Sequence, residues 1–171
     1  MANTKSKSAA EQAVEEQKVQ VIVPKEIDPD QYVTVRNGFH GRLIYKSPRT
    51  GEKFVWGEFG DEQEMQLREL RDAKNSKKSF FINNWFMFEE PWVIDYLGMR
   101  KYYKYAVKIE DFDNIFKKTP AQIEKTVGDM SQGQRRSLIY RATELIASGD
   151  IDSRKVIQAL ENALGVELAE K

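Results

Sequence analysis

The sequence contains no cysteine, and this absence excludes several classes of site. Without a thiol there is no disulfide bond, no thiolate nucleophile and no zinc site with cysteine ligands. Histidine is nearly as scarce, because His40 is the only one in 171 residues. A catalytic or metal-binding role for His40 would have to be built without a second imidazole. We therefore expect His40, which stands between Gly38 and Gly41 in a predicted turn, to be non-catalytic.

Long apolar runs are also missing. No stretch approaches the roughly 20 apolar residues that cross a membrane, and the N-terminus lacks the apolar run of a secretory signal. We expect a soluble protein that is not exported by the usual route and has no membrane partner.

An excess of charge of one sign is absent as well. Lys plus Arg and Asp plus Glu both number 27, so the formal net charge is zero. This balance lacks the electrostatic footprint of a protein that wraps nucleic acid, and only residues 31–118 lean slightly basic. A nucleic-acid partner is therefore not expected from the charge.

Catalytic motifs are lacking too, and no glycine-rich phosphate loop of Walker or Rossmann spacing occurs. Pairs of acidic residues could hold a hard cation through oxygen ligands, but each pair also stands where a helix cap or a loop charge is expected. These pairs are Glu89 with Glu90, Asp111 with Asp113, and Asp150 with Asp152. The sequence predicts no enzyme, no cofactor, no metal and no small-molecule substrate.

The first 30 residues are interpreted as an extended arm. Residues 1–18 are polar, and valine then alternates along VQVIV before Pro24 stops the run. A short strand without a hairpin mate must pair with an edge of its own domain or of a neighbour. A disordered leader is the alternative. We expect Val19, Val21 and Val23 to contact a partner.

Residues 31–118 have the pattern of an α+β core. Three β-rich runs at 32–35, 43–45 and 54–56 are separated by Asn37-Gly38 and by SPRTG, which are turn signals. They predict a small antiparallel β-meander. Apolar residues at near-helical spacing then predict an amphipathic helix over 61–75, and Pro91 is expected to begin another.

Residues 119–171 predict a C-terminal helical subdomain. Thr119-Pro120 opens one helix, and Ser131 with Gln134 has the form of a capping box that opens a second. The second and third helices, ending near 147 and 164, carry matching apolar stripes that favour a helical hairpin packed on the first helix. A helix-turn-helix is the alternative, but Asp150 and Asp152 stand where phosphates would approach.

Residues 79–92 read SFFINNWFMFEEPW, and six of them are Phe or Trp. Alternate positions do not separate into one polar, solvent-exposed face and one apolar, buried face. Either both faces are buried or the run changes structure midway. Each large aromatic buries roughly 150–250 Å², more than a small meander and one helix can cover. Because aromatics are enriched at interface cores, we expect a mixture of core and partner contact. The candidates for partner contact are Trp85, Phe86, Phe88 and Trp92.

Two basic clusters allow a different function. With interleaved tyrosines they could form a stacking platform for single-stranded nucleic acid, although a solvated face with exposed ammonium groups is the simpler interpretation. The clusters are Lys74, Lys77 and Lys78, and Arg100, Lys101 and Lys104, the second interleaved with Tyr102, Tyr103 and Tyr105.

Four segments together resemble an uncharacterised structural (virion) protein family of tailed bacteriophages of Gram-positive hosts. They are VTVRNGFHGRLIYKSPRTGEKFVW, DEQEMQLRELRDAKNS, FFINNWFMF and the closing stretch from MSQGQ to GVEL, and they span about 31–168. The resemblance implies a non-enzymatic subunit of the head, neck or tail, such as a capsid or tail component. Its partners would be other virion proteins and copies of itself, and assembly would take place in the host cytoplasm. The alternative is a nucleic-acid-binding or regulatory protein that uses the aromatic-rich middle segment, and an enzyme with an unfamiliar carboxylate site ranks third.

Overall fold

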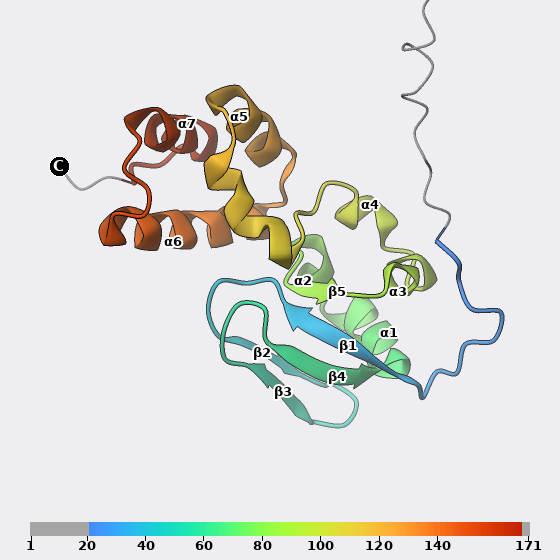
Figure 1. The fold of residues 1–171 in the computed structure, drawn as a ribbon. Coiled ribbons are helices and arrows are strands. Elements are labelled where there is room, and N and C mark those ends of the chain that lie inside the picture. Colours follow the sequence, from blue (N-terminus) through green and yellow to red (C-terminus); the bar gives the residue numbers. More distant parts are fainter. Residues whose placement is uncertain (1–20, 169–171) are drawn as a thin grey trace, which may run out of the picture.

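The computed structural model describes residues 21–168 and shows two layers, a small sheet with short helices and a group of longer helices (Figure 1). The predicted α+β class is confirmed. In chain order the elements are β1 (Tyr32–Asn37), β2 (Leu43–Lys46), β3 (Lys53–Trp56), β4 (Glu62–Gln66), α1 (Leu67–Ser76), α2 (Ser79–Ile82), β5 (Phe86–Phe88), α3 (Pro91–Tyr96), α4 (Arg100–Tyr103), the 3₁₀ helix η1 (Ile109–Lys117), α5 (Pro120–Asp129), α6 (Gln132–Ser148) and α7 (Arg154–Leu164).

Strand β1 is the central strand of a three-stranded antiparallel sheet with the order β4-β1-β5. Val33 stands opposite Met65 of β4, and Val35 stands opposite Phe88 of β5. Val33 and Val35 are buried while Tyr32 is exposed, the alternation expected of a strand with one face on a core.

Strands β2 and β3 form a separate hairpin, and its turn is as predicted. The Ser47 amide donates to the Glu52 carbonyl, and Gly51 supplies the positive φ of 76° that the turn requires. The predicted meander is wrong because β1 pairs with β4 and β5 rather than with β2. The hairpin is instead held to the sheet by the Trp56 indole, which donates to the Val35 carbonyl at 2.9 Å.

The helix predicted over 61–75 begins late, at Leu67, because residues 62–66 form strand β4. Met65 and Leu67 are both buried, so the apolar spacing that suggested one helix fits a strand followed by a helix equally well. Leu70 continues the apolar face of α1, and beside it the buried Glu69 accepts a 2.8 Å hydrogen bond from the Tyr45 hydroxyl. This bond joins α1 to the β2–β3 hairpin.

The aromatic stretch changes structure midway, which was one of the two predicted possibilities. It begins as α2 and continues as β5. Asn84 makes the change of direction with a φ of 54°, a left-handed conformation that Asn tolerates better than most residues. Its side-chain amide donates to the Tyr102 carbonyl at 2.9 Å, which fixes the turn against α4.

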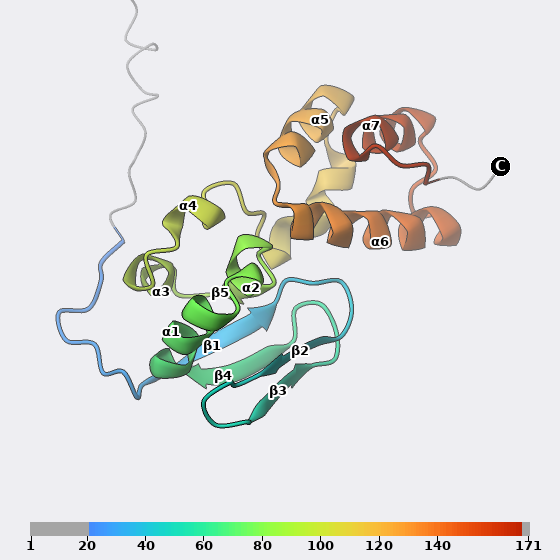
Figure 2. The same ribbon diagram turned by 180° about the vertical axis from the view of Figure 1, so that it is seen from behind.

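The helical layer has the predicted helices with their predicted starts. Thr119 and Gln122 form a reciprocal capping box on α5, and the Ser131 hydroxyl accepts from the Gln134 amide at the start of α6. Gly149 and Gly165 end α6 and α7 in the left-handed conformation. Figures 1 and 2 show α5 and α7 side by side above α6, so α7 pairs with α5 rather than forming a simple hairpin with α6.

Each layer has its own apolar cluster, and the limits of the clusters differ from the predicted boundaries. Phe112, Ile115 and Phe116 of η1 pack into the helical cluster, so η1 belongs with the C-terminal layer although the predicted boundary followed residue 118. At the other end, the Pro29 and Gln31 carbonyls accept the first amides of α1, and Ile27 packs on the core. Residues 27–30 therefore belong to the core, although they were assigned to the arm.

Candidate functional site

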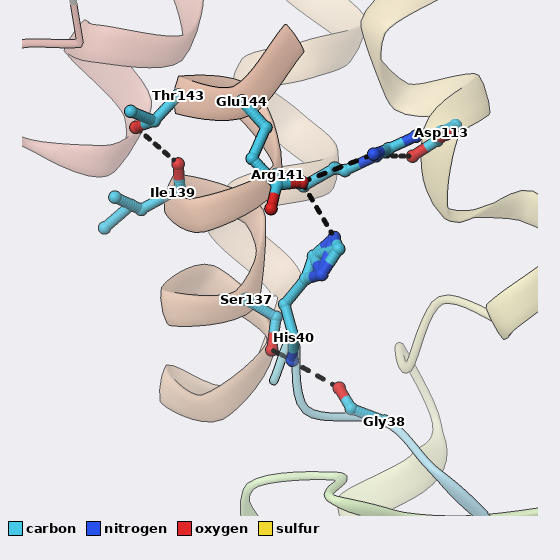
Figure 3. A network of polar contacts seen from close by, with 8 residues as sticks. All are labelled: Gly38, His40, Asp113, Ser137, Ile139, Arg141, Thr143 and Glu144. Atoms are coloured by element: carbon cyan, nitrogen blue, oxygen red, sulfur yellow. Dashed lines mark hydrogen bonds and ion pairs between the residues drawn. The ribbon is translucent and has the colours of Figure 1, made fainter. Parts of the chain in front are cut away.

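The two layers meet where the N-terminal half of α6 contacts the loop after β1 (Figure 3). The Ser137 hydroxyl accepts from the His40 amide at 3.2 Å and donates to the Gly38 carbonyl at 3.3 Å. Gly133 lies so close to the turn after α2 that a Cβ there would stand 2.2 Å from the Asn83 carbonyl oxygen. The small residues of α6 thus let two backbones approach closely.

Gln134, in the first turn of α6, departs from the sequence-based expectation. Its side chain does not return to Ser131 to complete a capping box. The side-chain oxygen Oε1 of Gln134 instead accepts from the Val107 backbone N–H at 3.0 Å, and its side-chain Nε2 donates to the Val107 carbonyl at 2.8 Å. Gln134 is buried, and these two bonds satisfy its polar atoms while fixing the segment that leads into η1.

The His40 imidazole extends from the same loop toward α6. Its Nε2 lies 3.8 Å from a Glu144 carboxylate oxygen, and its ring centre lies 5.1 Å from that of Phe59. Burial lowers the pKa of His40, and the negative charge of Glu144 opposes this effect only in part. The imidazole is therefore predominantly neutral at neutral pH.

Arg141 joins α6 to η1 beside His40. Its guanidinium makes two hydrogen bonds of 3.0 and 2.7 Å to the Asp113 carboxylate and a third of 3.3 Å to Glu144. Hydrogen bonding from Arg141 lowers the pKa of Asp113. The bidentate geometry fixes the orientation of η1 on α6.

A cleft of about 660 Å³ opens beside these residues. Glu58, Glu110, Asp113 and Glu144 line it together with His40 and Arg141, so its acidic side chains outnumber its basic ones. An imidazole near a carboxylate could act as a base, but it needs a hydroxyl to activate. The Ser137 hydroxyl is bonded to backbone groups and not to the imidazole. The geometry at Ser137 is therefore that of a structural contact between layers.

The predicted acidic pairs serve as local structural groups where the structure describes their contacts. Asp113 binds Arg141, Glu90 accepts from the Trp92 indole, and Asp150 accepts from the Ser148 hydroxyl. Within residues 21–168, no group of three or more His, Cys, Asp or Glu side chains has the arrangement to hold a metal ion.

The residues predicted to contact a partner fall into different environments. Phe86 is fully buried and Trp92 is 8% exposed, so neither offers a surface and both are corrected to core residues. Trp85, Phe88 and Val21 are half-buried, and partner contact at these three positions stays a prediction. Val23 is 41% exposed and its neighbour Ile22 86%, whereas Val19 lies outside the described residues.

Phe39 and Tyr140 were not anticipated, yet they form a row of rings with the half-buried Trp85 of the aromatic stretch, in which Phe39 is half-buried and Tyr140 exposed. The Trp85 and Phe39 ring centres lie 6.1 Å apart, and Phe39 lies 6.3 Å from Tyr140 on α6. The Trp85 indole N–H is buried and has no acceptor among residues 21–168. No local pattern could have identified this row, because its members come from three segments distant in sequence.

Comparison with known proteins adds no relationship: no protein family, curated protein or solved structure matches the chain. Within the described residues, no helix has the length and apolar character needed to cross a membrane.

Proposed function

We propose that the chain is a non-enzymatic structural subunit of a tailed-phage virion, a component of the head, neck or tail. It acts through contacts with other virion proteins and with copies of itself. It assembles in the host cytoplasm and remains in the particle. The resemblance of residues 31–168 to virion proteins motivates this assignment.

The observation that carries the proposal is the exposed apolar segment ahead of the core. Ile22 is 86% exposed and Val23 is 41% exposed, and residues 21–23 pair with no strand of the described chain. Their backbone groups remain available for pairing with the edge of another subunit. β-Branched residues favour extended backbone, so this segment is suited to adding a strand to the sheet edge of another subunit.

Removal of the arm tests the proposal. Ile27, Pro29 and Gln31 contact the core, and the partly buried Val21 also packs on it, so a truncation of residues 1–24 retains the first three contacts and loses only that of Val21. We expect the truncated chain to unfold at nearly the same temperature as the full chain and to lose incorporation into particles. Normal incorporation of the truncated chain would contradict the proposal.

The absence of cysteine permits a second test in the full-length chain. A thiol-specific crosslinker on Ile22→Cys should join position 22 to another virion protein or to a second copy in assembled particles. Ile44→Cys is the matched control, because Ile44 is 48% exposed but lies on the β2–β3 hairpin. Equal crosslinking from both positions would show that position 22 has no specific partner.

A further inference from the structure

The two basic clusters, separate in sequence, come together around tyrosine rings. The ammonium groups of Lys78, before α2, and of Lys101, on α4, lie 5.7 and 4.9 Å from the centre of the Tyr102 ring. Lys104 lies 5.0 Å from the centre of the Tyr105 ring. These distances are within the range of cation–π interactions. We call these five residues the lysine–tyrosine surface.

The lysines of this surface have no acidic partners. Every ion pair among residues 21–168 uses an arginine or His40 as its cation, and none uses a lysine. The adjacent Arg100 is different, because its guanidinium is bonded to Asp95 at 2.6 Å. Lys101, by hydrogen bonding and by its charge, lowers the pKa of the Tyr102 hydroxyl, and Lys78 adds to this effect. The surface therefore carries positive charge that the subunit itself does not neutralise.

Lys101, Tyr102 and Tyr105 of this surface also line a hollow of about 200 Å³. Its apolar walls include Ile82, Tyr105 and Met130, and its polar groups include Ser131 and Asp129, its single carboxylate. Tyr105 is 54% exposed and Ile82 is 40% exposed, so the apolar wall is open to solvent. A planar group with hydrogen-bonding edges fits the chemistry of this lining.

We propose that the lysine–tyrosine surface binds single-stranded nucleic acid, with phosphates at the lysines and an unstacked base against Tyr105 in the hollow. Single-strand sites combine cations that follow the backbone with aromatic rings on which bases stack, and this surface offers both. A duplex is a poorer fit, because its bases are already stacked and α4 is too short to read a groove. An acidic protein segment would use the lysines but would leave the exposed aromatic wall unoccupied. The inference goes beyond the proposed subunit contacts and does not depend on them.

The experiment measures binding of the full-length chain to a fluorescent 12-nucleotide single-stranded DNA between 50 and 200 mM salt. Each phosphate contact on a single strand contributes about 0.7 to the slope of log K against log salt. In the combined variant Lys78→Gln, Lys101→Gln, Lys104→Gln, the magnitude of that slope should therefore fall by about 2. The control Lys46→Gln, Lys53→Gln, Lys118→Gln removes the same charge at exposed positions elsewhere and should retain the slope.

Stacking is tested separately with tyrosine variants. Tyr105→Ala should weaken binding about 5- to 150-fold with little change in the salt slope, the range expected for one stacked base. Tyr32→Ala, at a tyrosine that is 62% exposed on β1, should have no effect.

Three results would overturn the inference. The first is equal binding by the lysine variant and its control. The second is equal competition: if poly-glutamate of the same charge displaces the probe as well as unlabelled oligonucleotide does, the surface would be assigned to an acidic protein. The third is equally tight binding of a 12-base-pair duplex, which would exclude base stacking as a determinant. Because truncation of the arm leaves this surface intact, oligonucleotide binding should persist in that variant even if the proposed subunit contacts prove wrong.

Discussion

The sheet layer and the helical layer differ in the sequence range of the contacts that stabilise each of them. Helices α5 and α6 begin at their own hydroxyl caps, Thr119 and Ser131, and α6 ends at its own glycine, Gly149. Strand β1, in contrast, finds its partners far along the chain, with Val33 opposite Met65 and Val35 opposite Phe88 in β5. Elements with local end signals could be predicted, whereas the pairing of β1 depended on packing that no local signal specifies.

Helix α6 belongs to both layers, and this explains how they are coupled. Its small residues Gly133 and Ser137 are buried against the sheet layer, at Asn83 and Gly38. Leu138 and Ala142 lie in the helical cluster. Because one helix contributes to the helical core and also packs directly on the sheet layer, we expect the layers to unfold together. The predictions below test this coupling and the difference between the layers, in order of expected effect.

The largest effect is expected at Phe86 in the sheet layer. Its ring is fully buried and lies 5.5 Å from the ring centres of both Trp56 and Phe81. Phe86→Ala should lower the free energy of unfolding by ~3–5 kcal/mol, measured by chemical denaturation. Phe88→Ala, at a half-buried position in the same strand, is the control and should cost less. Equal losses would place Phe86 outside the core.

In the helical layer, Leu160→Ala should cost ~2–5 kcal/mol because Leu160 is fully buried in α7. Leu145→Ala should cost less, since Leu145 is only half-buried. Tryptophan reports on the coupling, because all three tryptophans, Trp56, Trp85 and Trp92, lie in the sheet layer. If the layers are coupled, Leu160→Ala shifts the tryptophan fluorescence transition and the helical circular dichroism transition together. A shift in circular dichroism alone would show that the layers unfold independently.

The contact between layers is tested by two glycines in neighbouring helices. Alanine normally stabilises a helix interior relative to glycine by about 1 kcal/mol. Gly128→Ala should follow this rule, because a Cβ there meets no atom within 4 Å. Gly133→Ala should instead destabilise by ~1–3 kcal/mol, because its Cβ would collide with the Asn83 backbone. Thermal unfolding of the two variants would contradict the close approach of the layers if both were stabilised.

The smallest effect concerns pH and His40 at the junction. Burial lowers the pKa of His40 below its ordinary 6.5, so the unfolded chain binds a proton more readily than the folded chain. This contribution to stability is present above pH 6.5 and is lost as the pH falls through the folded-state pKa. The unfolding free energy should therefore decrease more steeply below pH 6.5 in the natural chain than in His40→Gln. Parallel pH profiles would show that His40 is not buried in the folded state.

Several features of the fold were determined by the sequence alone because their stabilising groups lie within a few residues of each other. The Thr119-Pro120 start of α5 and the SPRTG turn each close their hydrogen bonds locally. The absence of cysteine by itself excludes disulfide and thiolate chemistry, whatever the fold. The lack of alternation along residues 79–92 also indicated a change of structure, although not its position.

The tertiary structure alone decided the features that depend on distant residues. Met65 and Leu67 fit a helical period and also fit a strand followed by a helix, and only pairing with β1 distinguishes the two. Phe86, the first residue of β5, became core while Trp85, just before the strand, remained partly exposed, and the position of β5 beside β1 decides between them. Lys78 and Lys101 meet at one tyrosine only after the chain has folded. In each case the stabilising contacts join segments that are distant in sequence and come close only when the chain packs.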